Sequence, residues 1–260
     1  MKIPMYQVDA FTEESFKGNP AAICILDRWI DKKSMQNIAM ENNLSETAFC
    51  VIKDDICELR WFTPEEEIDL CGHATLATAY ILFEILHYHS SIIKFATQSG
   101  ILTVEKQGDN MTMEFPSREG IKSEIEEQLV KSLGKEPKEV YQSRDLMAVY
   151  DNEEDIKELT PNMEALKLIN AFGIIVTSKG KNSDFVSRYF APSCGVLEDP
   201  VTGSAHCTLI PYWSKILGKT KMTARQLSKR SGVLECEYAH DKVRISGKAR
   251  LFFKGEIYLT

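Results

Sequence analysis

The chain has 260 residues, of which 43% are hydrophobic and 27% charged, as in ordinary folded proteins of one large or two small domains. Its net charge of −7 and its pI near 5.4 disfavour a nucleic-acid-binding protein, and no basic run indicates an anionic membrane surface. The N-terminus lacks the pattern of a signal peptide, and the seven cysteines are odd in number and form no CxxC pair. We therefore expect a cytoplasmic protein with reduced thiols that binds neither nucleic acid nor membrane.

Short strands separated by turns dominate the chain. Alternation of apolar and polar residues predicts strands over 6–11, 22–26, 48–52, 58–62, 103–106, 111–115, 174–177, 186–190, 233–238, 243–246 and 251–259. Helical spacing predicts amphipathic helices over 31–42, with a capping Asp31, and over 124–133 and 162–172.

Two further predicted helices, 72–86 and 203–217, are apolar nearly all round, as expected for helices wrapped by sheet. Pro211 is expected to kink or end the second. Because strands outnumber helices and alternate mostly with period two, the predicted class is α+β with mainly antiparallel sheets. No GxGxxG or Walker pattern favours a nucleotide-binding fold.

The chain contains an internal repeat. The sequence RWFTP at 60–64 is echoed by RYFAP at 188–192, and each is followed by an acidic stretch and a Gly-led helix start at Gly72 or Gly203. A predicted helix and strand precede both copies in the same order. We therefore expect two half-domains of one architecture, 1–116 plus 247–260 and 117–246, with the active site in a cleft between them.

The two Gly-led helix starts are candidate anion sites. A helix N-terminus offers unpaired N–H groups and a positive dipole end, which favour a group such as a carboxylate. A glycine alone more often permits close packing. Here Gly72 and Gly203 recur within a repeat and are followed directly by His73 and Ser204, which favours a functional interpretation.

Two carboxylates are candidates for chemistry. Glu46 lies between a predicted helix end and an apolar strand, where partial desolvation would raise its pKa and suit it to moving protons. From spacing alone, a solvated turn glutamate is the more common outcome. Asp199 precedes a proline, which keeps it out of helical geometry, and Ser204 is expected in the first helical turn. An N-capping loop would explain that segment equally well.

Other chemistries have weak support in the sequence. The dense pairs Cys71-x-His73, His87-x-His89 and His206-Cys207 do not form the four-ligand spacing of a structural zinc site. Buried thiols and surface histidines explain them better. A Ser-His-Asp hydrolase is also disfavoured, because no GxSxG sequence is present. We expect no metal and no organic cofactor.

Five segments, in order along nearly the whole chain, resemble the signature segments of the PhzF-like (phenazine biosynthesis-like) family. They are GNPAA at 18–22, NLSETAF at 43–49, RWFTP at 60–64, DLCGHAT at 69–75 and EDPVTGSA at 198–205. The resemblance implies the diaminopimelate-epimerase fold, in which two α+β half-domains each wrap a sheet around a central helix, and it implies a homodimer.

The resemblance also implies roles for individual residues. The family's proton-shuttling glutamate falls on Glu46, its histidine on His73, and its aspartate and serine on Asp199 and Ser204. The residues beside them would contact a small anionic substrate, and these are Cys71, Gly72, Ala74, Thr202 and Gly203. Two-thiol epimerases of this fold place acid/base cysteines where this chain has Cys71 and Thr202, so two-thiol racemisation is not expected.

The implied function is a cofactor-independent isomerase that moves a proton on a small carboxylate-bearing metabolite by general acid–base catalysis. The phenazine-pathway members isomerise a dihydro-hydroxyanthranilate, which is one option here. Two alternatives stay open. One is an epimerase, racemase or dehydratase of an amino acid or hydroxy-amino acid that uses Cys71 or Glu46. The other is a non-catalytic ligand-binding relative, which would have little need for Glu46.

Overall fold

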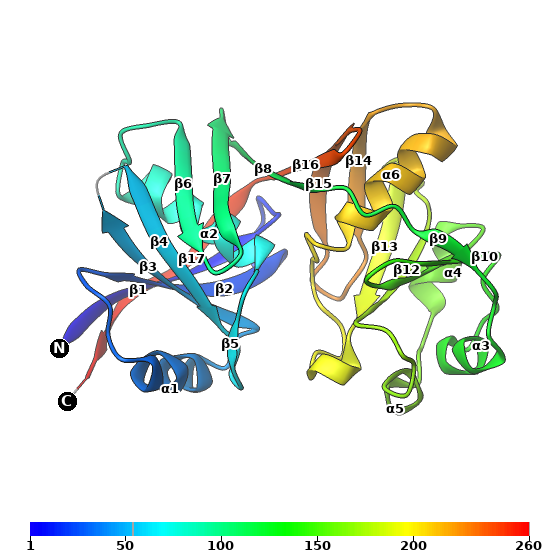
Figure 1. Cartoon of the computed structure of the whole chain (residues 1–260), viewed down its shortest axis with the longest axis horizontal. Helices are drawn as coiled ribbons and strands as arrows, with labels where there is room; N and C mark the ends of the chain where they lie inside the picture. Colours follow the sequence, from blue (N-terminus) through cyan, green and yellow to red (C-terminus); the bar gives the residue numbers. More distant parts are fainter. Residues whose placement is uncertain (54, 260) are drawn as a thin grey trace. The chain divides into compact units, whose positions relative to one another are not determined.

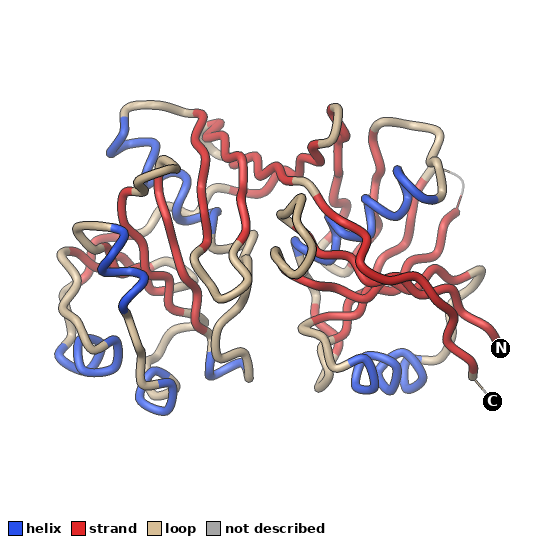
Figure 2. The backbone as a smooth tube through the Cα atoms, turned by 180° about the vertical axis from the view of Figure 1, so that it is seen from behind, coloured by secondary structure: helices blue, strands red, loops and turns tan. Residues whose placement is uncertain are grey.

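The computed structural model describes residues 1–53 and 55–259, and it divides into two compact units. The first unit comprises Met1–Glu114 and Ser246–Thr260, and the second comprises Phe115–Ile245. Figure 2 shows strands running through both units and helices that are short. No helix among the described residues is long and apolar enough to span a membrane.

The first unit is one mixed sheet around one buried helix. Its elements are β1 (Lys2–Ala10), β2 (Asn19–Leu26), α1 (Lys32–Asn42), β3 (Glu46–Lys53), β4 (Ile56–Phe62), β5 (Glu67–Ile68), α2 (Gly72–Tyr80), η1 (Ile81–Ile85), β6 (Ile92–Thr97), β7 (Gly100–Gln107), β8 (Asn110–Pro116) and β17 (Ala249–Tyr258). The strand order is β17-β1-β2-β3-β4-β6-β7-β8, and only β2–β3 and β4–β6 in this series are parallel.

The second unit repeats this topology. Its elements are β9 (Ile121–Ser123), α3 (Glu127–Leu133), β10 (Glu139–Gln142), β11 (Leu146–Val149), α4 (Glu153–Glu158), α5 (Met163–Leu166), β12 (Ile174–Lys179), β13 (Phe185–Phe190), η2 (Pro192–Cys194), α6 (His206–Leu217), β14 (Lys221–Gln226), β15 (Gly232–Ala239) and β16 (Lys242–Gly247). The order β9-β10-β11-β12-β13-β14-β15 contains two parallel pairs, β11–β12 and β13–β14, at the positions equivalent to those of the first unit.

Both predicted apolar helices are buried (Figure 1). In α2 every residue from His73 to Ala79 is buried, and the helix packs against β1, β2, β3 and β17. In α6 the residues 206–211 are all buried, and the helix packs against β15. The α+β class and the central helices predicted from the sequence are therefore confirmed.

Three predicted helices have different bounds in the structure. The helix expected over 162–172 is only the short α5, and the one expected over 124–133 begins at Glu127. The helix expected from Gly203 begins at His206, so Ser204 lies in a turn before the helix and not in its first turn. In that turn, His206 N–H bonds to Gly203 O at 3.0 Å and Cys207 N–H to Ser204 O at 3.2 Å. These tight i→i+3 bonds replace the helical pattern.

Pro211 neither ends α6 nor leaves an unsatisfied group. A proline lacks the N–H that would bond to the carbonyl four residues earlier, which here is that of Cys207. The backbone N–H of Arg118 donates to Cys207 O instead, at 2.9 Å. The helix therefore continues to Leu217 through its proline.

The strands that the sequence did not predict are short or weakly patterned. They are β5, β6, β9, β10, β11 and β14. For example, β11 has the sequence LMAV and is buried at all four residues, so it shows no alternation. The β14 sequence KMTARQ does alternate in burial but has few residues of high strand propensity.

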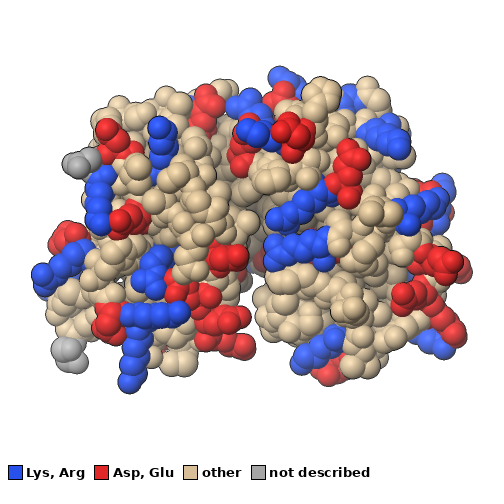
Figure 3. All heavy atoms as spheres, in the orientation of Figure 1, with Lys and Arg blue, Asp and Glu red and all other residues tan. Residues whose placement is uncertain are grey.

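Acidic and basic side chains are interspersed on the molecular face drawn in Figure 3. This mixed surface agrees with the absence of basic runs in the sequence.

Candidate active site

Glu46 is the first residue of β3 and follows the C-terminal end of α1. That helix ends at Asn43, whose left-handed backbone (φ 50°) closes the last turn by donating its N–H to Ala39 O. The chain then enters β3, where Glu46 pairs with Ala21 of the parallel strand β2. The Glu46 side chain is only 14% exposed. The predicted desolvated position of this carboxylate is therefore what the structure shows.

Cys71 and His73 lie at the N-terminal end of α2. Cys71 is the N-cap residue, has extended backbone angles, and is buried, as is His73 in the first turn. The ring Nδ1 of His73 lies 3.6 Å from Cys71 Sγ, and its Nε2 lies 3.0 Å from Glu46 Oε2. One imidazole thus lies between a thiol and a carboxylate. The Nε2–Oε2 approach lacks hydrogen-bond geometry, so both atoms are buried without a hydrogen-bond partner.

The charges in this cluster depend on one another. Burial disfavours an imidazolium at His73, but its interactions with Cys71 and Glu46 outweigh burial and hold the pKa of His73 well above its ordinary value. Burial, reinforced by the Glu46 carboxylate, raises the pKa of the Cys71 thiol. The arrangement therefore favours a protonated thiol and an imidazolium facing a carboxylate.

The second group of candidates lies in the loop before α6. Asp199 precedes Pro200, as the sequence shows, and its Oδ2 accepts a short hydrogen bond from the Thr202 hydroxyl. Thr202 is 7% exposed, and its carbonyl contacts Nδ1 of His206 at 2.8 Å. Gly203 and Ser204 follow in the turn described above. Asp199 thus has a hydroxyl partner within its own loop.

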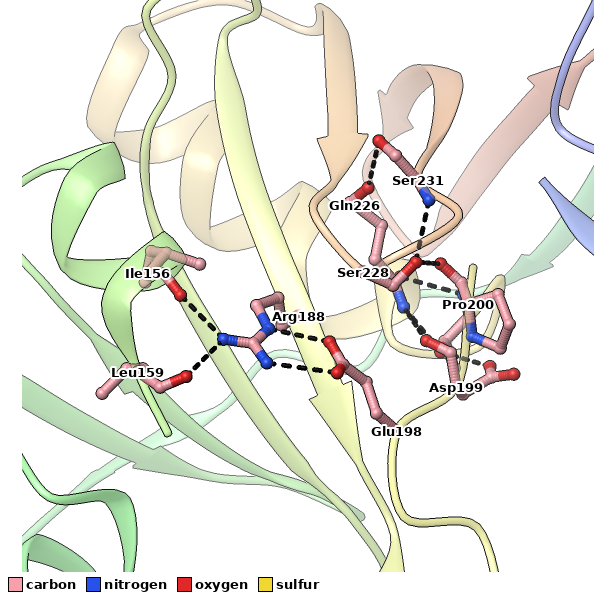
Figure 4. A network of polar contacts seen from close by, with 10 residues as sticks. Ile156, Leu159, Arg188, Glu198, Asp199, Pro200, Gln226, Ser228 and Ser231 are labelled. Carbon is pink, nitrogen blue, oxygen red and sulfur yellow. Dashed lines mark hydrogen bonds and ion pairs between the residues drawn. The ribbon is translucent and has the colours of Figure 1, made fainter. Parts of the chain in front are cut away.

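Gln226, at the end of β14, fixes this loop from the sheet side and was not predicted from the sequence. It is fully buried, and its Oε1 accepts from Thr202 N–H at 2.9 Å while its Nε2 donates to Asp199 O at 2.7 Å. Nearby, the Ser228 hydroxyl donates to Pro200 O at 2.8 Å. Figure 4 shows these side chains converging on the Asp199–Pro200 backbone. Because β14 was not predicted as a strand, nothing in the sequence pointed to Gln226.

The repeat in the sequence places an arginine–glutamate pair in each unit. Arg60 of β4 bonds Glu67 through Nε at 2.6 Å and Nη2 at 2.9 Å, and its guanidinium lies over the ring of Phe62. Arg188 of β13 bonds Glu198 through the same atoms at 2.7 and 3.1 Å (Figure 4).

Both pairs fix the acidic stretch that leads into a central helix. Glu198 directly precedes Asp199. The Arg60 guanidinium holds the pKa of Glu67 at about 2, so this carboxylate stays ionised. Glu67 and Glu198, the arginine-paired glutamates of the two acidic stretches, are therefore structural.

His206 differs from His73 although both lie near the start of a central helix. It is fully buried, and its Nε2 has no hydrogen-bond partner. Burial lowers the pKa of His206 to about 4, so the ring is neutral at pH 7. A neutral ring donates from Nδ1 to the Thr202 carbonyl.

The predicted residues thus form two local groups. Glu46, Cys71, His73 and the adjoining Gly72 and Ala74 belong to the first unit, and the remaining candidates belong to the second. Within residues 1–53 and 55–259, Glu46, Cys71 and His73 are the one group of three side chains with donor atoms close enough to hold a metal ion, all within 4.8 Å of one another.

Comparison with known proteins places these motifs in context. The family model described as phenazine biosynthesis-like protein (PhzC-PhzF) matches residues 8–255. A protein of Pseudomonas aeruginosa, named as an uncharacterized isomerase, is 48% identical over 259 residues, and the alignment covers 100% of both chains. The crystal structure of a PhzF-family protein of Enterococcus faecalis has a TM-score of 0.98 at 49% identity, with 100% of both chains covered.

A more distant structure shows the fold alone. A hydroxyproline epimerase of Agrobacterium vitis has a TM-score of 0.66 at 9% identity, over 98% of this chain and 92% of that one. Its similarity is consistent with the epimerase-like architecture described above.

Proposed function

The chain belongs to the phenazine biosynthesis-like (PhzC-PhzF) family and is an isomerase, and we propose that it moves a proton on a small carboxylate-bearing metabolite with Glu46 as acid and base. The observation that carries this proposal is the buried Glu46 carboxylate 3.0 Å from the His73 imidazole. Proton transfer by a positioned side chain typically contributes about 10²–10⁴-fold to a rate.

The proposed reaction needs one carboxylate that reaches two carbons. Ionised Glu46 removes a proton from the first carbon, and the electron pair left behind is delocalised toward an electron-withdrawing group of the substrate. Protonated Glu46 then returns the proton to the second carbon, so the product is an isomer and no oxidant or reductant is consumed. The imidazolium of His73, 3.0 Å from Glu46 Oε2, keeps the carboxylate in place.

A role of Asp199 and Ser204 in the same reaction stays a prediction, because it rests on the family motif. The contacts of Gln226 support it, because a loop fixed by buried hydrogen bonds can present its groups without reorganising. The positive end of α2 is proposed to bind the substrate carboxylate through Gly72 and Ala74. A substrate contact of Gly203, in the turn before α6, stays a prediction from the family motif. A homodimer, a cytoplasmic location and independence of an organic cofactor also stay predictions.

One observation favours a second candidate function. Cys71 Sγ lies 3.6 Å from the other ring nitrogen of His73, so a thiol is within reach of the same proton network. An epimerase that uses Cys71 would be inactivated by a thiol alkylator, whereas an isomerase that uses Glu46 alone would keep its turnover in a Cys71→Ser variant.

The test of the proposed function is a screen of metabolite pools in heavy water, in which mass spectrometry reads deuterium incorporated by the enzyme. For a metabolite that exchanges, Glu46→Gln is expected to lower the exchange rate by at least ~10², because the amide cannot accept a proton. Glu41→Gln is the matched control, since Glu41 is exposed on α1. Thermal melting checks that both variants are folded.

Two outcomes would count against the proposal. A folded Glu46→Gln protein that exchanges deuterium at the wild-type rate would show that another group, such as Cys71 or Asp199, is the base. A wild-type protein that binds small carboxylates but promotes no exchange in any metabolite would favour the non-catalytic alternative.

A further inference from the structure

We propose that Glu46, Cys71 and His73 form a binding site for a zinc ion, which blocks the isomerase reversibly. The sequence offered only the pair Cys71-x-His73, which is too little for a zinc site. The structure adds a carboxylate from β3, a strand separated from that pair by β4 and β5. Thiolate, imidazole and carboxylate are the three ligand types that zinc takes in proteins.

The distance between the first two donors fits a tetrahedral ion. Zinc–sulfur and zinc–nitrogen bonds of about 2.3 and 2.0–2.1 Å imply a sulfur–nitrogen separation of about 3.5 Å across a tetrahedral angle. Cys71 Sγ and His73 Nδ1 are 3.6 Å apart. These two donors are therefore already spaced as an edge of the coordination tetrahedron.

Glu46 is placed to supply the third ligand. The three donor atoms lie within 4.8 Å of one another, and a tetrahedral site needs them about 1 Å closer than that limit. Glu46 Oε2 lies at Nε2, the other ring nitrogen of His73, so the proposed site requires the Glu46 side chain to turn toward Nδ1. A water or a substrate oxygen would take the fourth position, as in zinc sites with three protein ligands.

The polar atoms of the cluster are incompletely satisfied without an ion. Glu46 Oε2 and His73 Nε2 are buried and make no hydrogen bond, although they lie 3.0 Å apart. Buried polar atoms without partners are costly, and an ion or an unplaced ligand is a common explanation for them. The buried Glu46 oxygen is held only by this ion pair, so it remains available as a third ligand beside the other two donors.

The predicted effect on the enzyme rests on the proposed function, whereas zinc binding itself does not. A zinc ion on Glu46 occupies the lone pair that would accept the substrate proton, and it removes His73 from its position beside the carboxylate. Bound zinc is therefore an inhibitor of the proposed proton transfer and not a cofactor for it.

The experiment titrates the full-length reduced protein with zinc chloride in competition with a chromophoric chelator. Wild type is expected to bind one equivalent, and Cys71→Ser to bind at least ~10² more weakly, because a thiolate is the strongest of the three donors. Cys194→Ser is the matched control, since Cys194 is exposed and belongs to the other unit. Cobalt substituted for zinc should show a thiolate charge-transfer band in wild type that Cys71→Ser lacks.

A second variant and an exchange assay complete the test. If Cys71→Ser melts at a much lower temperature, His73→Gln replaces it with the same expected loss of binding. Equal zinc affinity in wild type and in the folded ligand variants, or no binding by wild type, would overturn the site. In the deuterium-exchange assay, zinc should stop exchange and EDTA should restore it. Exchange that continues with zinc bound would refute the inhibition alone, whereas the Glu46→Gln comparison judges the proposed function separately.

Discussion

The two units have the same strand order but place different chemistry at the start of the central helix. In the first unit, α2 begins beside a thiol, an imidazole and a carboxylate, and the pKa values of the thiol and of the imidazole are raised. In the second, the loop before α6 is held by the amide of Gln226, and the nearby His206 is neutral. One topology thus holds a group of titrating residues in one unit and a hydrogen-bonded loop beside a neutral histidine in the other.

The difference suggests that the first unit serves proton transfer and the second serves binding of the anionic substrate. Proton transfer requires groups whose charge can change, and such groups are concentrated around Glu46. Binding a constant negative charge requires donors that stay in place, and the hydrogen bonds around Thr202 provide a fixed loop for this purpose. The predictions below test this comparison by altering equivalent positions in the two units.

The largest expected loss of stability follows from replacing Arg188, and it should exceed the loss at the equivalent Arg60. Arg188 bonds Glu198 and also the carbonyls of Ile156 and Leu159, at 3.1 and 2.8 Å. Arg188→Leu removes a charged donor from all three partners and is expected to lower the free energy of unfolding by about 2–4 kcal/mol.

The equivalent change Arg60→Leu should cost less, about 1–2 kcal/mol. The reason is that Glu67 keeps Lys32 at 2.8 Å and Gln98 as partners. Urea unfolding of the two variants measures both values. An equal or larger loss in Arg60→Leu would show that the carbonyl contacts of Arg188 contribute little.

The next prediction contrasts the two buried histidines by pH. His206 has a folded pKa of about 4, below the value of about 6.5 expected for the unfolded chain. The unfolded state therefore binds the proton first, and stability is lost as pH falls from about 6.5 to 4, by up to about 3 kcal/mol. His206→Gln should flatten the unfolding free energy over this range.

His73 should act in the opposite direction. Its folded pKa is raised, so its contribution is full below the unfolded pKa and is lost as pH rises through the folded one. His73→Gln should leave the acid limb of the pH–stability profile unchanged and alter the neutral-to-alkaline limb. If both variants changed the same limb, the assigned charge states would be wrong.

The last comparison concerns Gln226, which has no counterpart described in the first unit. Gln226→Leu is close in size but leaves Thr202 N–H without its acceptor, and it should cost about 1–3 kcal/mol of unfolding free energy. Gln226→Glu keeps an acceptor for Thr202 N–H but loses the donor to Asp199 O, and it adds a buried charge. In the exchange assay, both variants should slow deuterium incorporation without changing zinc affinity. Unchanged exchange in a folded Gln226→Leu protein would show that a fixed loop is not needed.

The sequence predicted the parts of the fold that depend on local pattern. Asp31 caps α1 as expected, with its carboxylate accepting from Ser34 N–H, and the two all-apolar helices are central. The helix over 162–172 was overpredicted because apolar spacing continues past Leu166, where the chain turns away. Spacing could not show that Thr202 O would be bonded by the His206 ring, which shifts the start of α6.

The candidate site was predictable only where a motif carried it. Cys71, His73 and Glu46 were singled out by family resemblance, whereas the contacts among them depend on the fold and were not predicted. Gln226 lies far along the chain from Thr202, and no local signal links the two. Partners of this kind are set by tertiary structure, which is why the network that fixes the Asp199 loop appeared only in the coordinates.

The proline within α6 has a consequence for how the chain opens. Pro211 leaves Cys207 O without its helical donor, and the N–H of Arg118 donates to this carbonyl instead. Arg118 lies outside any helix or strand, yet its amide proton is protected from exchange with solvent by this bond. That amide proton can exchange with solvent only when this bond breaks, by movement of its own segment or by opening of α6. Slow hydrogen exchange at Arg118 would therefore report on the central helix of the second unit, from a position 88 residues before the helix begins when counted from His206.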